Sequence, residues 1–255
     1  MRKLILTAMT AVALAAGVPK AEAAGGGVAL PDRDWSWEGV FGNFDRDQLR
    51  RGFLVYQNIC SSCHGLDLLY YRNLTQLGYT DEEVKAIAAQ KEVEDGPNDE
   101  GEMFYRPAKP SDNFVDPFPN EEMARLVNGG SLPPDLTLMA EARAGGADYI
   151  YALMTGYKDV PPEGADVPAG KYYNEYFPGH AIGMPPQLYP GMVSYPDGTE
   201  ATPEQMAADV AGFLRWTAEP NLEQRKSLGV KVMIYLAILT ALFYALKRRI
   251  WARVH

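Results

Sequence analysis

The stretch CSSCH, residues 60–64, contains the only two cysteines of the 255-residue chain and one of its three histidines. Cysteine pairs spaced C-x-x-C and followed directly by histidine are the attachment signature of a c-type haem. The chemistry requires this spacing, because two thiols add to the two vinyl groups and the adjacent imidazole reaches the iron. The sequence therefore predicts one covalently attached haem c, with Cys60 and Cys63 as its thioether residues and His64 as an axial ligand.

The residues before this stretch predict the helix that presents it. Leu49, Phe53 and Tyr56 recur at helical spacing, and Asp45 is placed to cap the helix, with Gln48 three residues on. If the helix continues through CSSCH, both thiols and the imidazole project from one side of a single turn.

Three other uses of the cysteines fit the sequence less well. A disulfide oxidoreductase would place C-x-x-C beside a βαβ pattern, and none precedes Cys60. A zinc site needs about four ligands, and besides the two cysteines only His64, His180 and His255 could contribute, of which His255 lies beyond the predicted membrane helix. A structural disulfide would leave His64 without a role.

Both ends of the chain have the composition of membrane-targeting segments. Residues 1–23 combine a basic start, an apolar run and small residues at the end, which predicts a cleaved signal peptide. Residues 227–247 are almost entirely apolar and predict a membrane helix, followed by a basic tail at 248–255. These features predict a haem domain at 24–226 outside the cytoplasm, anchored by a single pass, with residues 248–255 as a short cytoplasmic tail.

The second axial ligand is expected from a loop near the end of the domain. Met184 lies in GHAIGMPPQLYP, residues 179–190, where glycine and proline exclude a helix. A helix follows, with Thr202 as its cap and Gln205 completing a capping box. His180 and Met192 are the alternative ligands. Four further methionines lie in helical patterns and are expected in the core: Met123, Met139, Met154 and Met206.

Additional helices fill the long interval between the two proposed ligands. A capping box at Thr80 and Glu83, an N-cap at Asn120 and the apolar run ADYIYALMTGY, residues 147–157, each predict one. The order of a C-x-x-C-H helix, a methionine loop and a closing helix is that of a mitochondrial-type c cytochrome. The predicted fold is mainly α, an enlarged mitochondrial-type (class I) c-type cytochrome domain with one C-terminal transmembrane helix.

Several longer segments resemble the cytochrome c1 family, the haem subunit of cytochrome bc1 complexes, over nearly the whole mature chain. They include RRGFLVYQNICSSCH (50–64), DGPNDEGEMFYRPAKPSDNF (95–114), NGGSLPPDLT (128–137), GGADYIYALMTGY (145–157), NEYFPGHAIGMPPQLYP (174–190) and FLRWTAEP (213–220). By this resemblance, Cys60 and Cys63 carry the haem, His64 and Met184 bind its iron, and Arg143 pairs with a haem propionate. Some bacterial members carry an additional cysteine pair, which this chain lacks.

The resemblance implies an electron relay rather than an enzyme acting on its own. The implied partners are cytochrome b, the Rieske iron–sulfur protein as electron donor and a soluble periplasmic c-type cytochrome as acceptor. Two alternatives are a tethered shuttle outside any complex and a haem enzyme such as a peroxidase or nitrite reductase. The shuttle would need a flexible linker, and the enzyme a vacant iron position or a second haem.

The distribution of charge suggests the chemistry of the soluble partner. The chain carries a formal charge of −9, which argues against nucleic acid, and residues 24–226 hold 16 Lys and Arg against 32 Asp and Glu, or −16. Residues 81–102 contain nine acidic side chains and only two lysines. This segment is predicted to attract a basic acceptor.

Overall fold

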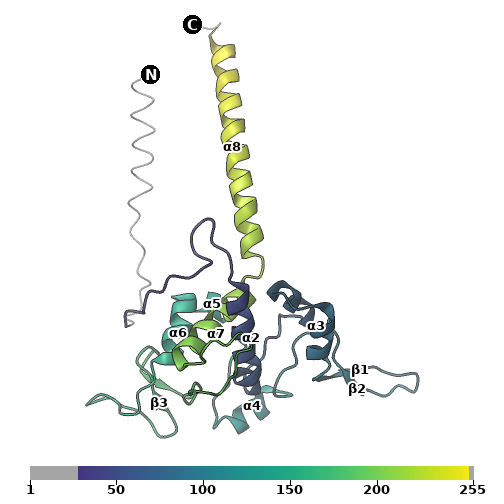
Figure 1. Cartoon of the computed structure of the whole chain (residues 1–255), viewed down its shortest axis with the longest axis vertical. Helices are drawn as coiled ribbons and strands as arrows, with labels where there is room; N and C mark the ends of the chain where they lie inside the picture. Colours follow the sequence, from purple (N-terminus) through teal and green to yellow (C-terminus); the bar gives the residue numbers. More distant parts are fainter. Residues whose placement is uncertain (1–27, 253–255) are drawn as a thin grey trace.

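The computed structural model describes residues 28–252, and most of its regular structure is helical. In chain order the elements are α2 (Arg46–Asn58), η1 (Cys60–Ser62), η2 (Tyr71–Leu77), α3 (Asp81–Ala88), β1 (Glu92–Asp95), β2 (Phe104–Pro107), α4 (Glu121–Val127), α5 (Met139–Ala142), α6 (Gly146–Thr155), β3 (Tyr172–Tyr173), β4 (Ala181–Ile182), α7 (Pro203–Ala218) and α8 (Leu222–Trp251) (Figure 1). The strands form only two short antiparallel pairs in this part of the chain. The predicted mainly α class is confirmed.

The core forms around the contact between α2 and α7. Asp45 caps α2 as predicted, because its carboxylate accepts hydrogen bonds from the first turn. Phe53 of α2 and Phe213 of α7 are almost completely buried, with ring centroids 5.7 Å apart. A Cβ at Gly52 would lie 2.0 Å from the main-chain oxygen of Asp209, so this close approach of two helices requires glycine. α5 and α6 pack on α7 as well, so elements from both ends of the domain share one core.

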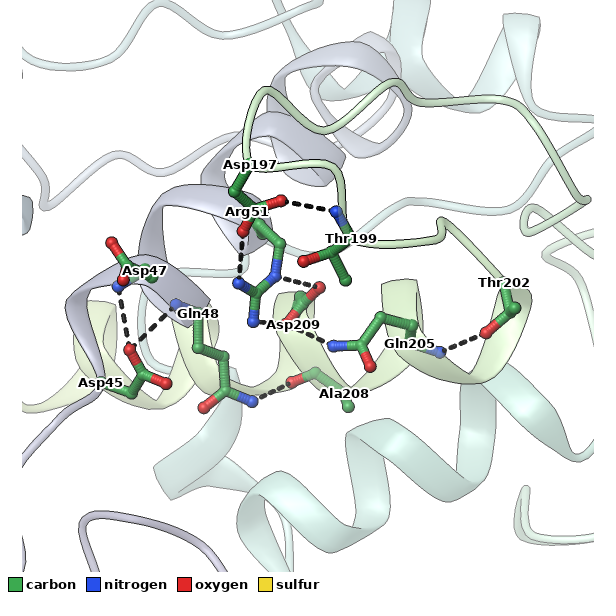
Figure 2. Close-up of polar contacts among 10 residues, drawn as sticks. All are labelled: Asp45, Asp47, Gln48, Arg51, Asp197, Thr199, Thr202, Gln205, Ala208 and Asp209. Atoms are coloured by element: carbon green, nitrogen blue, oxygen red, sulfur yellow. Dashed lines mark hydrogen bonds and ion pairs between the residues drawn. The ribbon is translucent and has the colours of Figure 1, made fainter.

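Local capping signals begin two other helices, one of them differently from the prediction. Thr80 and Glu83 form the expected capping box of α3. Thr202 caps α7 by accepting a hydrogen bond from the main-chain nitrogen of Gln205 at 3.1 Å. The Gln205 side chain does not complete the predicted box, because it donates instead to the buried carboxylate of Asp209 at 3.0 Å (Figure 2).

A two-stranded hairpin projects from the helical body (Figure 1). Its strands β1 and β2 are antiparallel, with Val93 opposite Arg106. Arg106 pairs with Asp95 on the neighbouring strand and with Asp112 beyond the hairpin, the latter at 2.6 Å. The sequence pattern predicted no strands here, because four-residue strands carrying charged side chains have no apolar alternation by which to recognise them.

The last helix extends away from the domain (Figure 1). α8 begins at Leu222, which is 2% exposed, and runs for 30 residues, about 45 Å at 1.5 Å per residue. Its most apolar window has a mean hydropathy of 2.0, so α8 has the length and composition of a single-pass membrane anchor. The helix starts before the predicted boundary at residue 227. The predicted signal peptide, 1–23, lies outside the described residues.

Candidate functional site

The CSSCH stretch lies in a tighter turn than predicted. α2 ends at Asn58, and Cys60–Ser62 form the 3₁₀ helix η1, so the expected continuation of the α-helix through the motif is wrong. The main-chain nitrogens of Cys63 and His64 both donate to the carbonyl oxygen of Cys60, at 3.1 and 2.9 Å. One turn therefore still presents the two thiols and the imidazole, and both cysteines are free.

The environment of the thiols does not favour disulfide exchange. A redox-active cysteine usually has a thiolate stabilised by a lowered pKa. Here burial raises the pKa of Cys60 to about 12, with a further contribution from nearby Cys63. Both thiols are half-buried, and the raised pKa of Cys60 agrees better with a site of covalent attachment than with an exchange centre.

The imidazole of His64 is oriented for coordination. Its Nδ1 lies 2.7 Å from the carbonyl oxygen of Pro134, which can only accept, so Nδ1 carries the proton and donates. Nε2 is then left with a free lone pair, as a neutral histidine ligand needs. Burial lowers the pKa of His64 below its usual range and favours this neutral form.

Two more hydrogen bonds hold the turn that carries His64. The hydroxyl of Tyr56 on α2 donates to the carbonyl oxygen of His64 at 3.0 Å. The main-chain nitrogen of Leu136 donates to the carbonyl oxygen of Gly65 at 3.0 Å. The segment 134–136 and α2 therefore hold the histidine from two directions, and these hydrogen bonds fix both its position and its tautomer.

Met184 lies in an irregular loop fastened to α6. The loop follows β4, and Met184 is half-buried. The hydroxyl of Tyr157, just after α6, donates to the carbonyl oxygen of Met184 at 3.0 Å. Asn174, fully buried, donates to the carbonyl oxygen of Leu153 at 2.7 Å and so ties the preceding segment to the same helix. The absence of helix around Met184 agrees with the sequence, and its role as ligand stays a prediction.

The other candidate ligands have different surroundings. His180 is exposed, has a φ of 58° and stacks on Tyr173 with ring centroids 5.7 Å apart. Met192 is 48% exposed. Both look like surface side chains, which leaves Met184 as the half-buried candidate among the three.

The expected core methionines divide into three groups. Met206 is fully buried, as predicted, and Met139 and Met154 are partly buried against the core. Met123 is 42% exposed, so its assignment to the core was wrong. α4 is a short surface helix with one buried residue, Ala124. The helical spacing of its apolar residues predicted the helix but not how much of its surface is buried.

Arg143 lies between α5 and α6 with its side chain exposed. Within residues 28–252 no ion pair includes it, and its side-chain hydrogen bond is a long one, 3.4 Å, to the carbonyl oxygen of Ala142. A guanidinium without a carboxylate partner suits a ligand carboxylate such as a haem propionate. The pairing itself remains a prediction.

Some residues of the site could not be found from sequence. Pro134 acts through its main-chain carbonyl, which has no signature in the side-chain pattern. Tyr157 and Asn174 are members of ordinary apolar and polar runs, and their partners are 27 and 21 residues away. The double proline at 133–134 was the only sequence signal, because it predicts an extended segment. It does not indicate that this segment contacts His64.

The donor set fits a covalently bound haem c. Two free thiols one turn apart, a neutral imidazole with an available Nε2 and a half-buried thioether in a fixed loop are the groups that such a cofactor requires. Among the described residues, no group of three His, Cys, Asp or Glu side chains could hold a metal ion in another way.

Comparison with known proteins agrees with this chemistry. The family model for the "Cytochrome C1 family" matches residues 35–254. Cytochrome c1 of Rhodospirillum rubrum is 49% identical over 249 residues, covering 92% of each chain. A mitochondrial cytochrome c1 heme protein of Solanum tuberosum is 50% identical over 90% of this chain and 88% of its own. Cytochrome b/c1 of Bradyrhizobium diazoefficiens is 46% identical over 88% of this chain but only 36% of its own. The chain therefore belongs to the cytochrome c1 family, whose members carry one covalently attached haem c.

Proposed function

We propose that this protein is the cytochrome c1 subunit of a cytochrome bc1 complex and relays single electrons. It takes them from a Rieske iron–sulfur protein and gives them to a soluble periplasmic c-type cytochrome. Family membership supports the relay. The Bradyrhizobium relative supports cytochrome b as a partner, because its name joins b and c1 and this chain covers only part of it. We infer no enzymatic activity for the chain by itself.

The observation that carries the proposal is the turn at Cys60–His64, which presents two free thiols and an imidazole whose Nδ1 is hydrogen-bonded. In the proposed site Cys60 and Cys63 would provide the thioether bonds, His64 and Met184 the two axial ligands, and Arg143 a charge partner for a propionate. Bound in this way, haem c supplies reversible one-electron chemistry, and Met/His ligation raises its potential. Two protein ligands leave no iron position for a substrate, which disfavours the peroxidase and nitrite reductase alternatives.

The connection between α7 and α8 disfavours an independent tethered shuttle. Only the segment 219–221 separates the two helices. Glu219 in this connection forms ion pairs with Arg215, at 2.7 Å, and with Arg225. A shuttle that reaches distant partners needs a long flexible linker. The short, ion-paired connection instead supports a subunit with fixed orientation in a complex.

We also infer the orientation of the protein in the membrane. The apolar part of α8 is followed by Lys247, Arg248 and Arg249, which favours a cytoplasmic C-terminus by the positive-inside rule. The bacterial relatives support an inner-membrane location. The haem domain, 24–226, then faces the periplasm.

Purification from native membranes tests the assignment. A tagged full-length chain should co-purify with cytochrome b and a Rieske protein, and quinol should reduce its haem in that preparation. The reduced protein should not bind carbon monoxide. Isolation without either partner would contradict membership of a complex, and carbon monoxide binding by the native protein would contradict a closed six-coordinate site.

An acidic surface is proposed to attract the soluble acceptor. The segment 81–102 covers α3, β1 and the tip of the projecting hairpin. Most of its acidic side chains are exposed: Asp81, Glu82, Glu83, Glu92, Glu94, Asp99, Glu100 and Glu102. Asp95 is an exception, because it pairs with Arg106 inside the hairpin. Long-range attraction from such a surface speeds encounter without requiring a large apolar contact.

The dependence of electron transfer on salt tests this surface. The rate to a basic acceptor should fall steeply as salt rises from 0.1 to 1 M, because the Debye length shrinks from about 10 Å to about 3 Å. Reversing Glu94, Asp99 and Glu100 should flatten the dependence while leaving the Asp95–Arg106 pair intact. The matched control reverses Glu121, Glu122 and Glu163, exposed acidic residues outside the segment. A rate that does not change with salt would contradict electrostatic docking.

A further inference from the structure

Two large apolar side chains are exposed in the segment before α2. Val40 is 62% exposed and Phe41 is 81% exposed. They lie in loop 37–43, part of the dark segment that rises beside the first turns of α8 in Figure 1. Single exposed apolar residues are common, but an adjacent pair held beside a membrane helix is a candidate contact surface.

α8 itself holds this loop. The ammonium group of Lys226, in the second turn of α8, donates to the carbonyl oxygens of Trp37, of Gly39 at 2.6 Å and of Gly42 at 3.4 Å. Lysine has three N–H donors, and this geometry uses all three. The position of the loop is therefore tied directly to the position of the anchor.

The loop is also closed on itself. The main-chain nitrogen of Asn43 donates to the carbonyl oxygen of Ser36 at 3.0 Å. A Cβ at Gly42 would lie 1.9 Å from the main-chain oxygen of Glu38, so this tight return requires glycine. The exposure of the apolar pair at its tip is thus a built feature rather than the result of a loose chain.

Two buried, stacked tryptophans support the loop on the side of the domain. Trp35 and Trp37 are 7% and 5% exposed and stack with ring centroids 4.7 Å apart. Trp35 donates through its indole nitrogen to Asp148 of α6 at 2.7 Å. Glu223 of α8 accepts from the main-chain nitrogen of Phe44 at 2.8 Å, just after the loop. The loop is therefore braced by the domain and by α8 together.

We propose that loop 37–43 is a second membrane contact, which inserts Val40 and Phe41 into the outer interface of the lipid bilayer. The exposed apolar surface of α8 begins at Leu228, about 3 Å along the axis from Lys226. Lys226 thus lies at the level of the headgroups, a layer several ångströms deep, and it holds the loop at that same level. Apolar side chains on amphipathic elements bury about 5–10 Å into this boundary.

Lipid is favoured over a protein partner as the occupant for two reasons. The contact is continuous with the membrane-facing surface of α8, to which Lys226 ties it. The exposed apolar tip consists of two side chains, whereas a standard protein interface buries about 800 Å² on each partner. This inference depends on α8 being a membrane anchor and is independent of the proposed electron relay.

Site-directed spin labelling of the full-length holoprotein tests the proposal. In the holoprotein proposed above Cys60 and Cys63 carry haem, so a single introduced cysteine can be labelled. The two positions are Phe41→Cys and, as the matched control, Val160→Cys, since Val160 is 83% exposed and lies in the loop between α6 and β3, away from α8 (Figure 1). Each labelled protein is reconstituted into phosphatidylcholine vesicles, and collisions with oxygen and with a water-soluble nickel complex are measured.

The label at 41 should collide with oxygen several-fold more, relative to nickel, than the label at 160. Lys226→Met should reduce the ratio at 41 and leave that at 160 unchanged, because the loop loses its attachment to α8. Equal ratios at the two positions would overturn the proposal. If the label at 41 is shielded from nickel only in the purified multi-subunit complex, the tip contacts a protein partner, which would also overturn the proposal. If Lys226→Met leaves the ratio at 41 unchanged, the proposed attachment of the loop through Lys226 is wrong.

Discussion

At the scale of single residues, Met184 should control the electronic properties of the site. Its loop is fixed by the hydrogen bond from Tyr157, so the side chain is presented with little freedom. Met184→Leu removes the thioether without changing the apolar volume greatly. We expect a lower midpoint potential and an iron that binds carbon monoxide when reduced, because thioether ligation raises the potential and closes the sixth position. Redox titration and visible spectra of the reduced protein measure both.

Met192→Leu is the control for this substitution. Met192 is 48% exposed and follows in the same irregular segment, so it should tolerate the change with neither effect. His180→Gln should also leave the potential close to that of the unmodified protein. A Met184→Leu variant with unchanged spectrum and potential would mean that another residue is the sixth ligand.

A second residue-scale prediction concerns a carboxyl group near the haem-attachment turn. A hydrogen bond with the Asp116 carboxyl, then burial and the nearby charge of Asp135, raises the pKa of Asp67 to about 7. In the unfolded chain this pKa is about 3.9. The folded protein thus binds this proton more tightly than the unfolded chain does. The contribution of Asp67 to the free energy of unfolding is therefore fully present below about pH 4 and is lost as pH rises to about 7.

Asp67→Asn should remove this part of the pH dependence. The free energy of unfolding, measured with denaturant between pH 4 and 8, should fall less steeply with rising pH in the variant than in the unmodified protein. Glu83→Gln provides a contrast, because hydrogen bonds from the capped turn lower rather than raise the pKa of Glu83. If Asp67→Asn and the unmodified protein show parallel pH profiles, the raised pKa is wrong.

At the scale of elements, a buried ion pair joins the first and last helices of the domain. Arg51 of α2 contacts Asp209 of α7 through Nε and Nη2, at 3.1 and 3.2 Å, and reaches Asp197 as well (Figure 2). Asp209 is fully buried. Removing one partner leaves a buried charge unpaired, so Arg51→Met should lower the free energy of unfolding by about 3–5 kcal/mol.

A double variant and an exposed pair provide the controls. Arg51→Met with Asp209→Leu should recover much of the loss, because two apolar groups of similar size can replace a buried pair at little cost. Arg46→Met, which breaks the more exposed pair with Glu223, should cost about 1 kcal/mol or less. A small effect of Arg51→Met alone would show that water or another group compensates Asp209.

An element could be predicted from the sequence when the residues that stabilise it lie within its own segment. The helices α2, α3, α4 and α7 were predicted from caps that lie at their own ends, and α6 from the apolar run of its own segment. The hairpin was not, because Arg106 is stabilised by Asp95 on one side and Asp112 on the other, which only pairing brings together. The 3₁₀ turn at Cys60–Ser62 was also missed, since its residue spacing is compatible with either kind of helix.

At the scale of the whole molecule, the helix that carries the anchor begins within the domain. The sequence predicts a separable domain ending at residue 226, and the first residue of α8, Leu222, is buried in the core of that domain. Glu223 and Lys226 add contacts from α8 to the segment before α2. We expect a chain ending after Lys226, exported normally, to be soluble, to carry covalent haem and to unfold with a midpoint close to that of the full-length protein.

A shorter truncation is the informative comparison. Ending the chain after Asn221 removes Leu222, whose burial contributes about 1.5–3 kcal/mol, and also removes the contacts of Glu223 and Lys226. This variant should unfold at a lower denaturant concentration. Equal stability of the two truncations would mean that the first turns of α8 belong to the anchor alone.

The short connection between α7 and α8 has a mechanical consequence. A domain joined to its helix by three residues, and held to it by Lys226 and Glu223, cannot swing or change height over the bilayer without breaking those contacts. In the proposed relay, these contacts would keep the haem at a constant distance from the membrane surface. In this relay, all of the travel that brings donor and acceptor within tunnelling distance falls to the partners, and this subunit acts as a stationary contact between two moving carriers.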